Sequence, residues 1–278
     1  MPFFGLRLAE GQNASFERIL FGCAKSTWKD ATNGLMRRKM PGDGDQFLRR
    51  SVGKAIHKYQ MIQNGDRIAV GVSGGKDSLS LLHFLSIRRQ WVPIRYDLVA
   101  IHIDLGFDGT GERLAPWFRQ EGILYHIEET RIGPIAHSEI NRENPCFLCA
   151  RLRRKRLFEL AFTMGCTKIA LAHHRDDIVE TLLINMFYSG EIGTMVPHQR
   201  LFNGKLSIIR PLALTDEDAI RGYARTKAFR VIESGCPTVK DAKRTQIKAI
   251  LAELARKNRR IKGNIFRSMR NIRKDYLP

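Results

Sequence analysis

Short apolar runs alternate with longer stretches of mixed polarity over most of this 278-residue chain. The runs are continuous, which is typical of strands buried on both faces of a sheet, and the stretches between them have the length and apolar spacing of helices. We expect strands at residues 67–72, 98–103, 123–127, 168–172 and 206–210, and helices at 46–60, 77–90, 112–121, 147–164 and 176–189.

This alternation predicts an α/β fold in which a parallel sheet has helices on both faces. Two more helices are expected, from Thr215, which suits an N-cap, to about 228, and at 241–258. Residues 1–46 then form an N-terminal extension that is at most partly helical, 47–235 form the main domain, and 236–278 form a basic helical C-terminal region.

Ligands of such sheets bind beyond the carboxyl ends of the strands. The first predicted strand is followed there by GVSGGKDS, residues 71–78. A Walker A loop would have a glycine where Val70 stands and a hydroxyl residue where Asp77 stands, so this is a different loop.

The loop still has the features of a phosphate cradle between a strand and a helix. Its two adjacent glycines let backbone N–H groups converge on an anion, and the helix N-terminus adds its dipole. The lysine adds a charge, the serines add hydroxyls, and Asp77 can hold Mg²⁺ or cap the helix. The predicted phosphate-binding residues are Ser73, Gly74, Gly75, Lys76, Asp77 and Ser78.

Polar residues also follow two other predicted strands. His173, Asp176 and Asp177 come after the fourth strand, where the two acids either cap a helix or lie near Mg²⁺ and ATP. Asp104 ends the second strand, so it is expected in the same crevice.

The charge of the chain indicates a polyanionic partner. Lys and Arg number 47 against 28 Asp and Glu, which gives a net charge of +19 and a pI of about 10.2. The excess is clustered: residues 240–278 hold 13 Lys or Arg and three Asp or Glu, and five of the six residues 151–156 are basic. Nucleic acid fits this pattern best, with a solvated basic face or acidic lipid as alternatives. No apolar run suits a membrane span or a secretory signal, so a cytoplasmic protein is expected.

Five cysteines are an odd number in a chain of this size, which argues against a disulfide framework. Cys146 and Cys149 form a CxxC pair that suits half of a zinc site, a redox pair, half of an iron–sulfur site or two core positions. Cys236 is the next candidate ligand, and three thiolates would hold a 4Fe–4S cluster with one iron left open. We expect Cys166 to be structural and Cys23 to take no part.

The string SGGKDS resembles the PP-loop of the ATP pyrophosphatase superfamily. The resemblance implies an adenine nucleotide alpha hydrolase-like, Rossmann-like fold whose loop grips the pyrophosphate of ATP while a substrate oxygen attacks the α-phosphate. The cysteine motif at 146–154, the segment KIALAHHRDDIVETLLINMFYSG at 168–190 and IIRPLA at 208–213 extend the likeness. From about Gln46 to Met269 the chain resembles the tRNA 2-thiocytidine synthetase family.

That resemblance implies an ATP-dependent tRNA sulfurtransferase that converts cytidine 32 of the anticodon loop to 2-thiocytidine. It implies ATP, Mg²⁺ and a 4Fe–4S cluster as cofactors, and tRNA and a sulfur-supplying cysteine desulfurase as partners. The sequence leaves open a homodimer. Many family members carry a second CxxC near the third ligand, whereas this chain has Cys236 alone.

The candidate site residues fall into four groups. The catalytic set is Lys76, Asp77, Cys146, Cys149 and Cys236, and the same three cysteines are the expected cluster ligands. The expected ATP contacts are Ser73 to Ser78, Asp104, His173 and Asp177, and the resemblance adds Ile103 through its backbone. The expected Mg²⁺ ligands are Asp77, Asp176 and Asp177. The expected tRNA contacts are Arg151, Arg153, Arg154 and Arg244.

Two other functions remain open at this point. A PP-loop sulfurtransferase acting on a different tRNA base would carry a persulfide on Cys149 or Cys236. A basic RNA-binding protein without catalysis would have a metal-stabilised fold, although binding alone gives no reason for an ATP loop.

Overall fold

The computed structural model describes residues 43–139, 145–232, 235–237 and 242–276. Chain contacts divide the protein into two units, Met1–Met40 and Pro41–Pro278, and every described residue lies in the second. Most of the predicted N-terminal extension, with Cys23, therefore lies outside the described residues.

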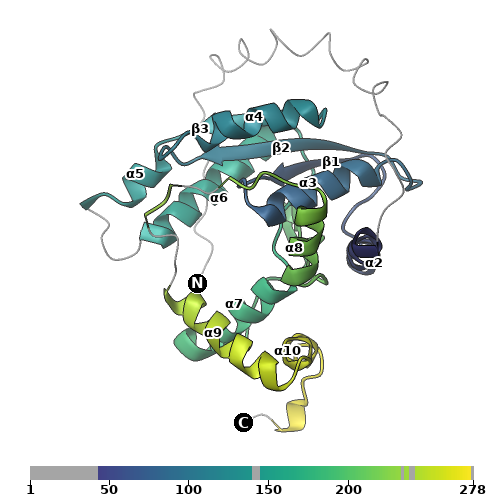
Figure 1. Ribbon diagram of the computed structural model, residues 1–278, viewed down its shortest axis with the longest axis vertical. Helices are drawn as coiled ribbons and strands as arrows, with labels where there is room; N and C mark the ends of the chain where they lie inside the picture. Colours follow the sequence, from purple (N-terminus) through teal and green to yellow (C-terminus); the bar gives the residue numbers. More distant parts are fainter. Residues whose placement is uncertain (1–42, 140–144, 233–234, 238–241, 277–278) are drawn as a thin grey trace. The chain divides into compact units, whose positions relative to one another are not determined.

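The described residues form one six-stranded sheet with the order β3-β2-β1-β4-β6-β5 (Figure 1). All neighbouring strands are parallel except β5 and β6, which pair antiparallel. The predicted α/β fold with a parallel sheet is confirmed, with one antiparallel edge strand added. The strands are β1 Asp66–Gly71, β2 Tyr96–Asp104, β3 Tyr125–Glu129, β4 Lys168–Ala170, β5 His198–Leu201 and β6 Leu206–Ile209.

The helices follow the predicted alternation closely, and short 3₁₀ turns occur at Phe202–Gly204 and Lys274–Tyr276. None in the described part of the chain is long and apolar enough to cross a bilayer. The helices are α2 Asp43–Lys58, α3 Lys76–Arg88, α4 Thr110–Gln120, α5 Ile132–Ala136, α6 Pro145–Thr163, α7 Arg175–Ser189, α8 Glu217–Thr226, α9 Ala242–Lys257 and α10 Ile261–Ser268.

Successive side chains of a strand point to opposite faces of the sheet, and this alternation divides the core in two. Ile68 and Val70 of β1 face a cluster that includes side chains of α2, α3, α4 and α8. Ala69, between them, faces a second cluster that includes side chains of α5 and α6. The sheet is therefore covered on both faces, as continuous apolar strands require.

A third apolar cluster holds the C-terminal helices to α7. Ile247 and Leu251 of α9 pack on Val179 of α7, with Ile265 and Phe266 of α10 beside them. Figure 1 shows α7 running between the sheet and these helices. The basic C-terminal helices thus belong to the same unit as the sheet and pack on α7, the helix that follows β4.

Thr215 is not an N-cap, so that prediction is wrong. The helix begins at Glu217, with Asp216 at the N-cap position. Thr215 is fully buried, and its hydroxyl lies 2.8 Å from that of Ser51 on α2. The hydroxyl that the local sequence offered to the cap is thus used in a long-range hydrogen bond between α2 and the segment before α8.

Candidate active site

The phosphate loop connects β1 to α3 and is held in shape by its own side chains. The hydroxyl of Ser78 donates to the carbonyl of Gly75 at 2.9 Å and accepts the N–H of Ser73 at 3.2 Å. Gly74 has φ of +88°, and a Cβ there would lie 3.0 Å from the carbonyl oxygen of Ile232. A side chain at position 74 would therefore be strained by backbone and by space.

This loop and the start of α7 lie where the order of the strands in the sheet reverses. The chain passes from β1 outward to β2 and β3, then returns to place β4 on the other side of β1. The carboxyl ends of β1 and β4 therefore flank the topological switch point, where open α/β sheets bind ligands. Gly75, at the N-cap of α3, has no side chain to satisfy the first N–H groups of the helix, which suits an anion.

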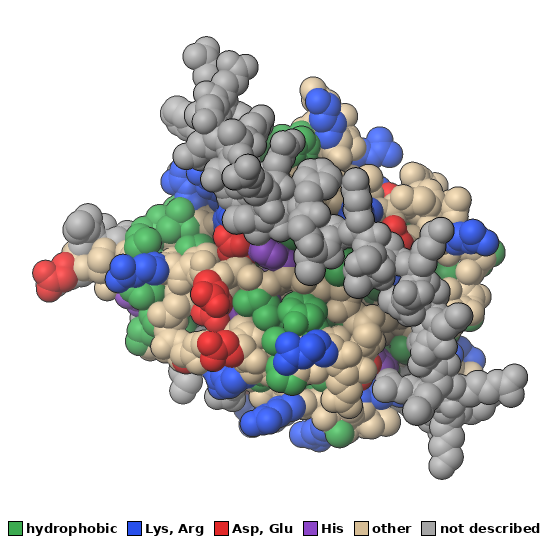
Figure 2. All heavy atoms as spheres, turned by 90° about the horizontal axis from the view of Figure 1, so that it is seen from above, with side chains coloured by type: hydrophobic (Ala, Val, Ile, Leu, Met, Phe, Trp, Pro, Cys, Tyr) green, Lys and Arg blue, Asp and Glu red, His purple; other side chains and the backbone are tan. Residues whose placement is uncertain are grey.

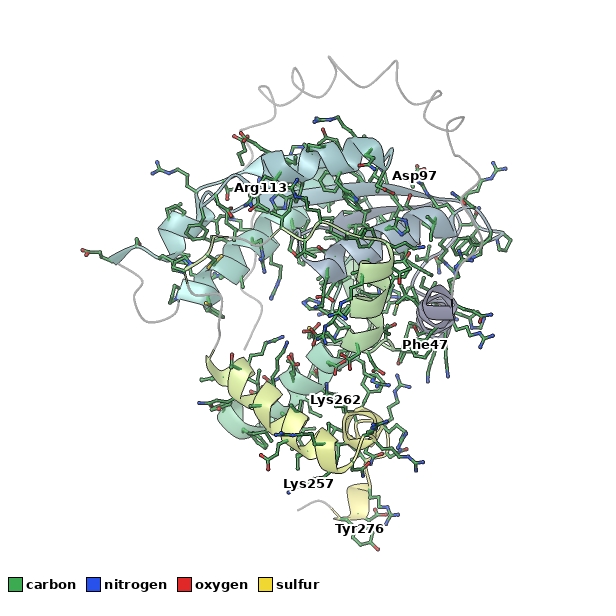
Figure 3. All side chains as sticks on the ribbon, viewed as in Figure 1. Phe47, Asp97, Arg113, Lys257, Lys262 and Tyr276 are labelled. Carbon is green, nitrogen blue, oxygen red and sulfur yellow. The ribbon has the colours of Figure 1, made fainter. Side chains whose placement is uncertain are left out.

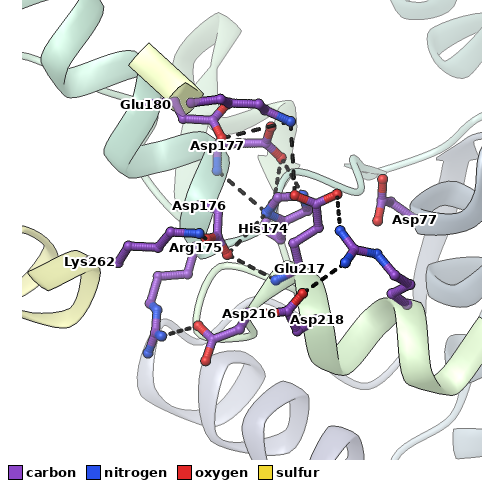
Figure 4. A network of polar contacts seen from close by, with 12 residues as sticks. Asp77, His174, Arg175, Asp176, Asp177, Glu180, Asp216, Glu217, Asp218 and Lys262 are labelled. Atoms are coloured by element: carbon purple, nitrogen blue, oxygen red, sulfur yellow. Dashed lines mark hydrogen bonds and ion pairs between the residues drawn. The ribbon is translucent and has the colours of Figure 1, made fainter. Parts of the chain in front are cut away.

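Lys76 lies between two carboxylates at this point, those of Asp77 and Glu217, which are labelled in Figure 4. Its ammonium is 3.1 Å from Asp77 Oδ2 and 3.0 Å from Glu217 Oε1, the latter at the start of α8. Burial opposes the charge on Lys76, yet the two carboxylates raise its pKa above the ordinary value. Burial also opposes the charge on Glu217, but the hydrogen bond from Lys76 lowers the pKa of Glu217 to about 2.

The acids after β4 are bound into the fold. Asp177 and His174 form a capping box at the start of α7, in which Asp177 Oδ2 accepts the N–H of His174 at 3.0 Å. Asp176 is buried and accepts the N–H of Glu217 at 2.9 Å and the ammonium of Lys262 at 2.5 Å. Asp176 thus ties α7 to α8 and α10, whereas Asp77 keeps 30% of its side chain exposed.

His173 and Asp104 also accept hydrogen bonds from groups of the chain. Burial and the adjacent Arg210 lower the pKa of His173 to about 4, so its ring is neutral near pH 7. The two oxygens of Asp104 accept the N–H groups of Gly106 and Gly111 at 2.9 and 2.8 Å. Asp104 shapes the turn after β2.

A cavity of about 630 Å³ opens beside that turn, at the ends of β2 and β3. Asp104, Gly111, Ile127 and Thr130 are among the residues that line it. Gly111 has no room for a side chain, because a Cβ would lie 2.5 Å from Ile127. Ile103, predicted to contact the nucleotide through its backbone, is buried. Its side chain packs in the second apolar cluster, with side chains of α5 and α6.

The three candidate cysteine ligands come together at the N-terminus of α6. Burial raises the pKa of Cys149; Arg153 opposes the rise, and the neighbouring Cys236 and Cys146 add to it. Cys236 Sγ lies 3.9 Å from His137 Nε2. Cys166 is buried in the core, where burial raises its pKa to about 11.

No three His, Cys, Asp or Glu side chains in the described ranges are close enough to hold a single metal ion. The ligands of a four-iron cluster stand around a much larger body than one ion. Cys146 and Cys236 are still near enough to add to the raised pKa of Cys149.

One chain segment joins the cysteines to the phosphate loop. Ile232 donates its N–H to the carbonyl of Gly74 at 3.0 Å, and Gly235 donates its N–H to Asp108 Oδ2 at 2.8 Å. Cys236 follows immediately. Four residues span at most about 14 Å, so Cys236 is within that distance of the residue bonded to the phosphate loop.

The basic residues predicted to contact tRNA separate into two sets. Arg151, Arg153 and Arg154 are exposed on α6. Arg244 instead points to Asp177 and lies 3.2 Å from it. On the face seen in Figure 2, basic and acidic side chains are mixed, so the visible part of that face carries no purely basic patch.

Sequence reasoning missed four charged residues of this site. Glu217 reads as a helix-start acid, Glu180 as a helix surface acid, and Lys248 and Lys262 as part of a basic tail. The local sequence pattern does not show that the packing of α7, α8, α9 and α10 brings these four residues together near the phosphate loop.

The loop at the switch point, the acids of α7 and the doubly covered sheet define a PP-loop nucleotide-binding protein. Residues 46–255 match the model of the PP-loop domain family. The tRNA-cytidine(32) 2-sulfurtransferase of Geobacter sulfurreducens is 40% identical over 239 residues, covering 83% of this chain and 91% of that protein. The enzyme of the same name from Alkalilimnicola ehrlichii is 40% identical over 237 residues, covering 83% and 74%.

Among solved structures, the U34-tRNA thiolase NcsA from Methanococcus maripaludis with its [4Fe-4S] cluster matches with a TM-score of 0.69 at 23% identity. That match covers 84% of this chain and 80% of the thiolase, and it shows a shared fold. The chain belongs to the PP-loop family of ATP-dependent tRNA sulfurtransferases, the tRNA 2-thiocytidine synthetase family that the sequence resembles.

Proposed function

We propose that this enzyme thiolates cytidine 32 in the anticodon loop of tRNA, at the expense of ATP. The relatives at 40% identity carry that substrate in their name. The observation that supports the proposal is that Ile232 donates its N–H to Gly74 of the phosphate loop, while Cys236, four residues further along the chain, neighbours Cys149.

The reaction divides into activation and sulfur transfer. The O2 atom of the cytosine attacks the α-phosphorus of ATP, and pyrophosphate leaves. A sulfur nucleophile derived from a cysteine desulfurase then attacks C2. Sulfide, released from the desulfurase persulfide by a reductant, adds directly. A protein persulfide would instead form an S–S bond to the base, and a second cysteine thiol would cleave that bond and leave a protein disulfide. The C2–O bond breaks, and AMP leaves with the oxygen. Activation is needed because a carbonyl oxygen leaves poorly and its adenylated form leaves well.

The phosphate loop would perform the first step mainly by positioning. N–H groups of the loop and of the first turn of α3 bind the pyrophosphate, and Lys76 adds a positive charge. Asp77 is the best placed acid for Mg²⁺, since Asp176 is buried and bonded to Lys262 and Glu217. Asp177 is the second candidate, although it already accepts from His174 and Arg244.

Cys146, Cys149 and Cys236 would hold a 4Fe–4S cluster. Burial and the neighbouring Cys236 and Cys146 raise the pKa of Cys149, which fits this role, because cationic irons offset the repulsion among thiolates. A cluster with three protein ligands supplies one open iron, which can bind a small anion such as sulfide. Arg151, Arg153 and Arg154 on the same helix would hold the tRNA backbone near these cysteines, with a steep dependence on salt.

The test is nucleoside mass spectrometry of tRNA from cells that lack this protein. Loss of 2-thiocytidine, with other thiolated nucleosides unchanged, is expected. Unchanged 2-thiocytidine would refute the substrate. Iron and acid-labile sulfide assays on protein purified without oxygen address the cluster separately: an iron-free, fully active enzyme would support persulfide chemistry instead.

A further inference from the structure

Cations from α9 and α10 reach the acids that surround the phosphate loop. Arg244 of α9 lies 3.2 Å from Asp177 and 3.6 Å from Glu180. Lys262 of α10 lies 2.5 Å from Asp176. In Figure 3, Lys262 lies on the side of these helices nearest α7 and α8, whereas Lys257 lies on the opposite side.

Lys248 of α9 occupies the central position among these charges. Its ammonium lies 3.8 Å from Glu180 and 3.9 Å from Glu217. Glu217 is the residue that also holds Lys76 at 3.0 Å. Lys248 and Lys76 therefore share one carboxylate, and a side chain of the basic C-terminal region is linked to the phosphate loop through a single residue.

The balance of charge explains why such a cation matters for ATP. Two carboxylates, those of Asp77 and Glu217, contact Lys76 of the phosphate loop. Three more, those of Asp176, Asp177 and Glu180, belong to the same network of charges on α7 to α10. A triphosphate brings further negative charge to the same place, and like charges repel strongly where water is scarce. Glu180 and Asp176 are the most confined of the five, since only 3% of each side chain is exposed.

We propose that Lys248 is a positioning residue of the ATP site. It offsets the charges of Glu180 and Glu217, so that Glu217 holds Lys76 less tightly and the ATP phosphates can take that lysine. Arg244 acts in the same way on Asp177 and Glu180. The inner cations of α9 thus serve ATP, while tRNA phosphates are left to the exposed arginines of α6 and to the outer side of the basic tail.

The proposal depends on ATP use by the loop and not on which base is modified, so it is tested without tRNA. Isothermal titration calorimetry with ATP and Mg²⁺ measures the Kd of each variant. Lys248→Met should raise the Kd for ATP about tenfold, and Lys248→Arg should stay near the wild type. Lys257→Met removes the same charge from the exposed end of the same helix and should leave the Kd for ATP unchanged. A Kd within about twofold of wild type for Lys248→Met would overturn the proposal.

Two further variants separate charge balance from loss of structure. Glu180→Gln combined with Lys248→Met removes both charges, and its Kd should return to within about threefold of wild type. Glu217→Gln alone should bind ATP about threefold more tightly, because Lys76 is no longer held. A misfolded protein cannot gain affinity, so weaker binding by Glu217→Gln, or failure of the double variant to recover, would contradict the assignment. If the wild-type protein binds ATP and the variants behave as expected, but the wild type does not thiolate tRNA, the result would count against the proposed function alone.

Discussion

The acids at the ends of β1 and β4 and the cysteines at the start of α6 are balanced in different ways. Asp176, Asp177 and Glu217 each have a lysine or arginine of the same chain within 3.2 Å. At the cysteines, burial and the neighbouring thiols raise the pKa of Cys149, and only Arg153 opposes the rise. The acids of the phosphate site are therefore balanced by cations of the chain itself, whereas burial and the neighbouring thiols disfavour the charged form of Cys149.

This comparison predicts that the two regions can be inactivated independently. Cys146→Ala should reduce formation of 2-thiocytidine to background, because the proposed cluster would lose one of three ligands. The Kd for ATP should remain within about twofold of wild type, since no contact of the phosphate loop changes. Nucleoside mass spectrometry of treated tRNA and calorimetry with ATP check the two statements.

Cys166→Ala is the matched control for that experiment. Cys166 is 5% exposed and packs in the core beside α6. The variant should retain iron and thiolation, with a modest loss of stability. Full thiolation by Cys146→Ala would remove the distinction between the two regions.

The second prediction concerns the phosphate site. Lys76→Met should lower the rate of pyrophosphate release about 10²–10³-fold, the usual effect of removing one preorganised charge from a developing anion. Cluster content should not change, because Lys76 contacts only Asp77 and Glu217 among the ion pairs described for it. Lys54→Met, which removes an exposed lysine on α2, should leave the rate unchanged. A fall of less than about threefold for Lys76→Met would mean that the loop amides alone bind the phosphates.

The third prediction tests whether packing holds the cations of α9 in place. Leu251 is 1% exposed against α7, and Leu251→Ala should reduce the free energy of unfolding by about 2–5 kcal/mol. Leu254→Ala, at a position that is 40% exposed, should cost less than about 1 kcal/mol. Urea unfolding measures both. If α9 carries the balancing cations, Leu251→Ala should also weaken ATP binding, and equal effects of the two variants would argue against a packed α9.

Much of the fold could be predicted because most strands contain short apolar runs, separated by stretches with the length and apolar spacing of helices. The strand at 198–201 was missed, since His198 and Arg200 break the apolar pattern and the strand pairs only at the sheet edge. The short helix at 132–136 was missed because it contains Gly133 and Pro134, which usually mark turns.

The site was less predictable than the fold, for a physical reason. The loop residues are contiguous, so the sequence displays them together. Lys262 and Asp176 are 86 residues apart, and their contact depends on how α10 packs against α7. A basic helix shows its charge in the sequence but not which of its cations face inward, and Arg244 was expected to contact tRNA for that reason.

The smallest expected effect is a pH dependence at the best buried acid of the phosphate site. Burial raises the pKa of Glu180 to about 7; Lys248 and Arg244 oppose the rise, and Asp177 and Asp176 add to it. The native state then binds a proton that the unfolded chain releases above its ordinary value of 4.5. Stability from this group is present below pH 4.5 and is lost as the pH rises toward 7.

The difference between Glu180→Gln and wild type isolates this contribution from other titrating groups. The free energy of unfolding of the variant should gain about 1–3 kcal/mol relative to wild type between pH 5 and 7.5. Urea unfolding at several pH values gives the difference directly. A difference that is flat with pH would show that Lys248 and Arg244 keep Glu180 ionised throughout, and the phosphate site would then be even more completely balanced within the chain than the cysteine site.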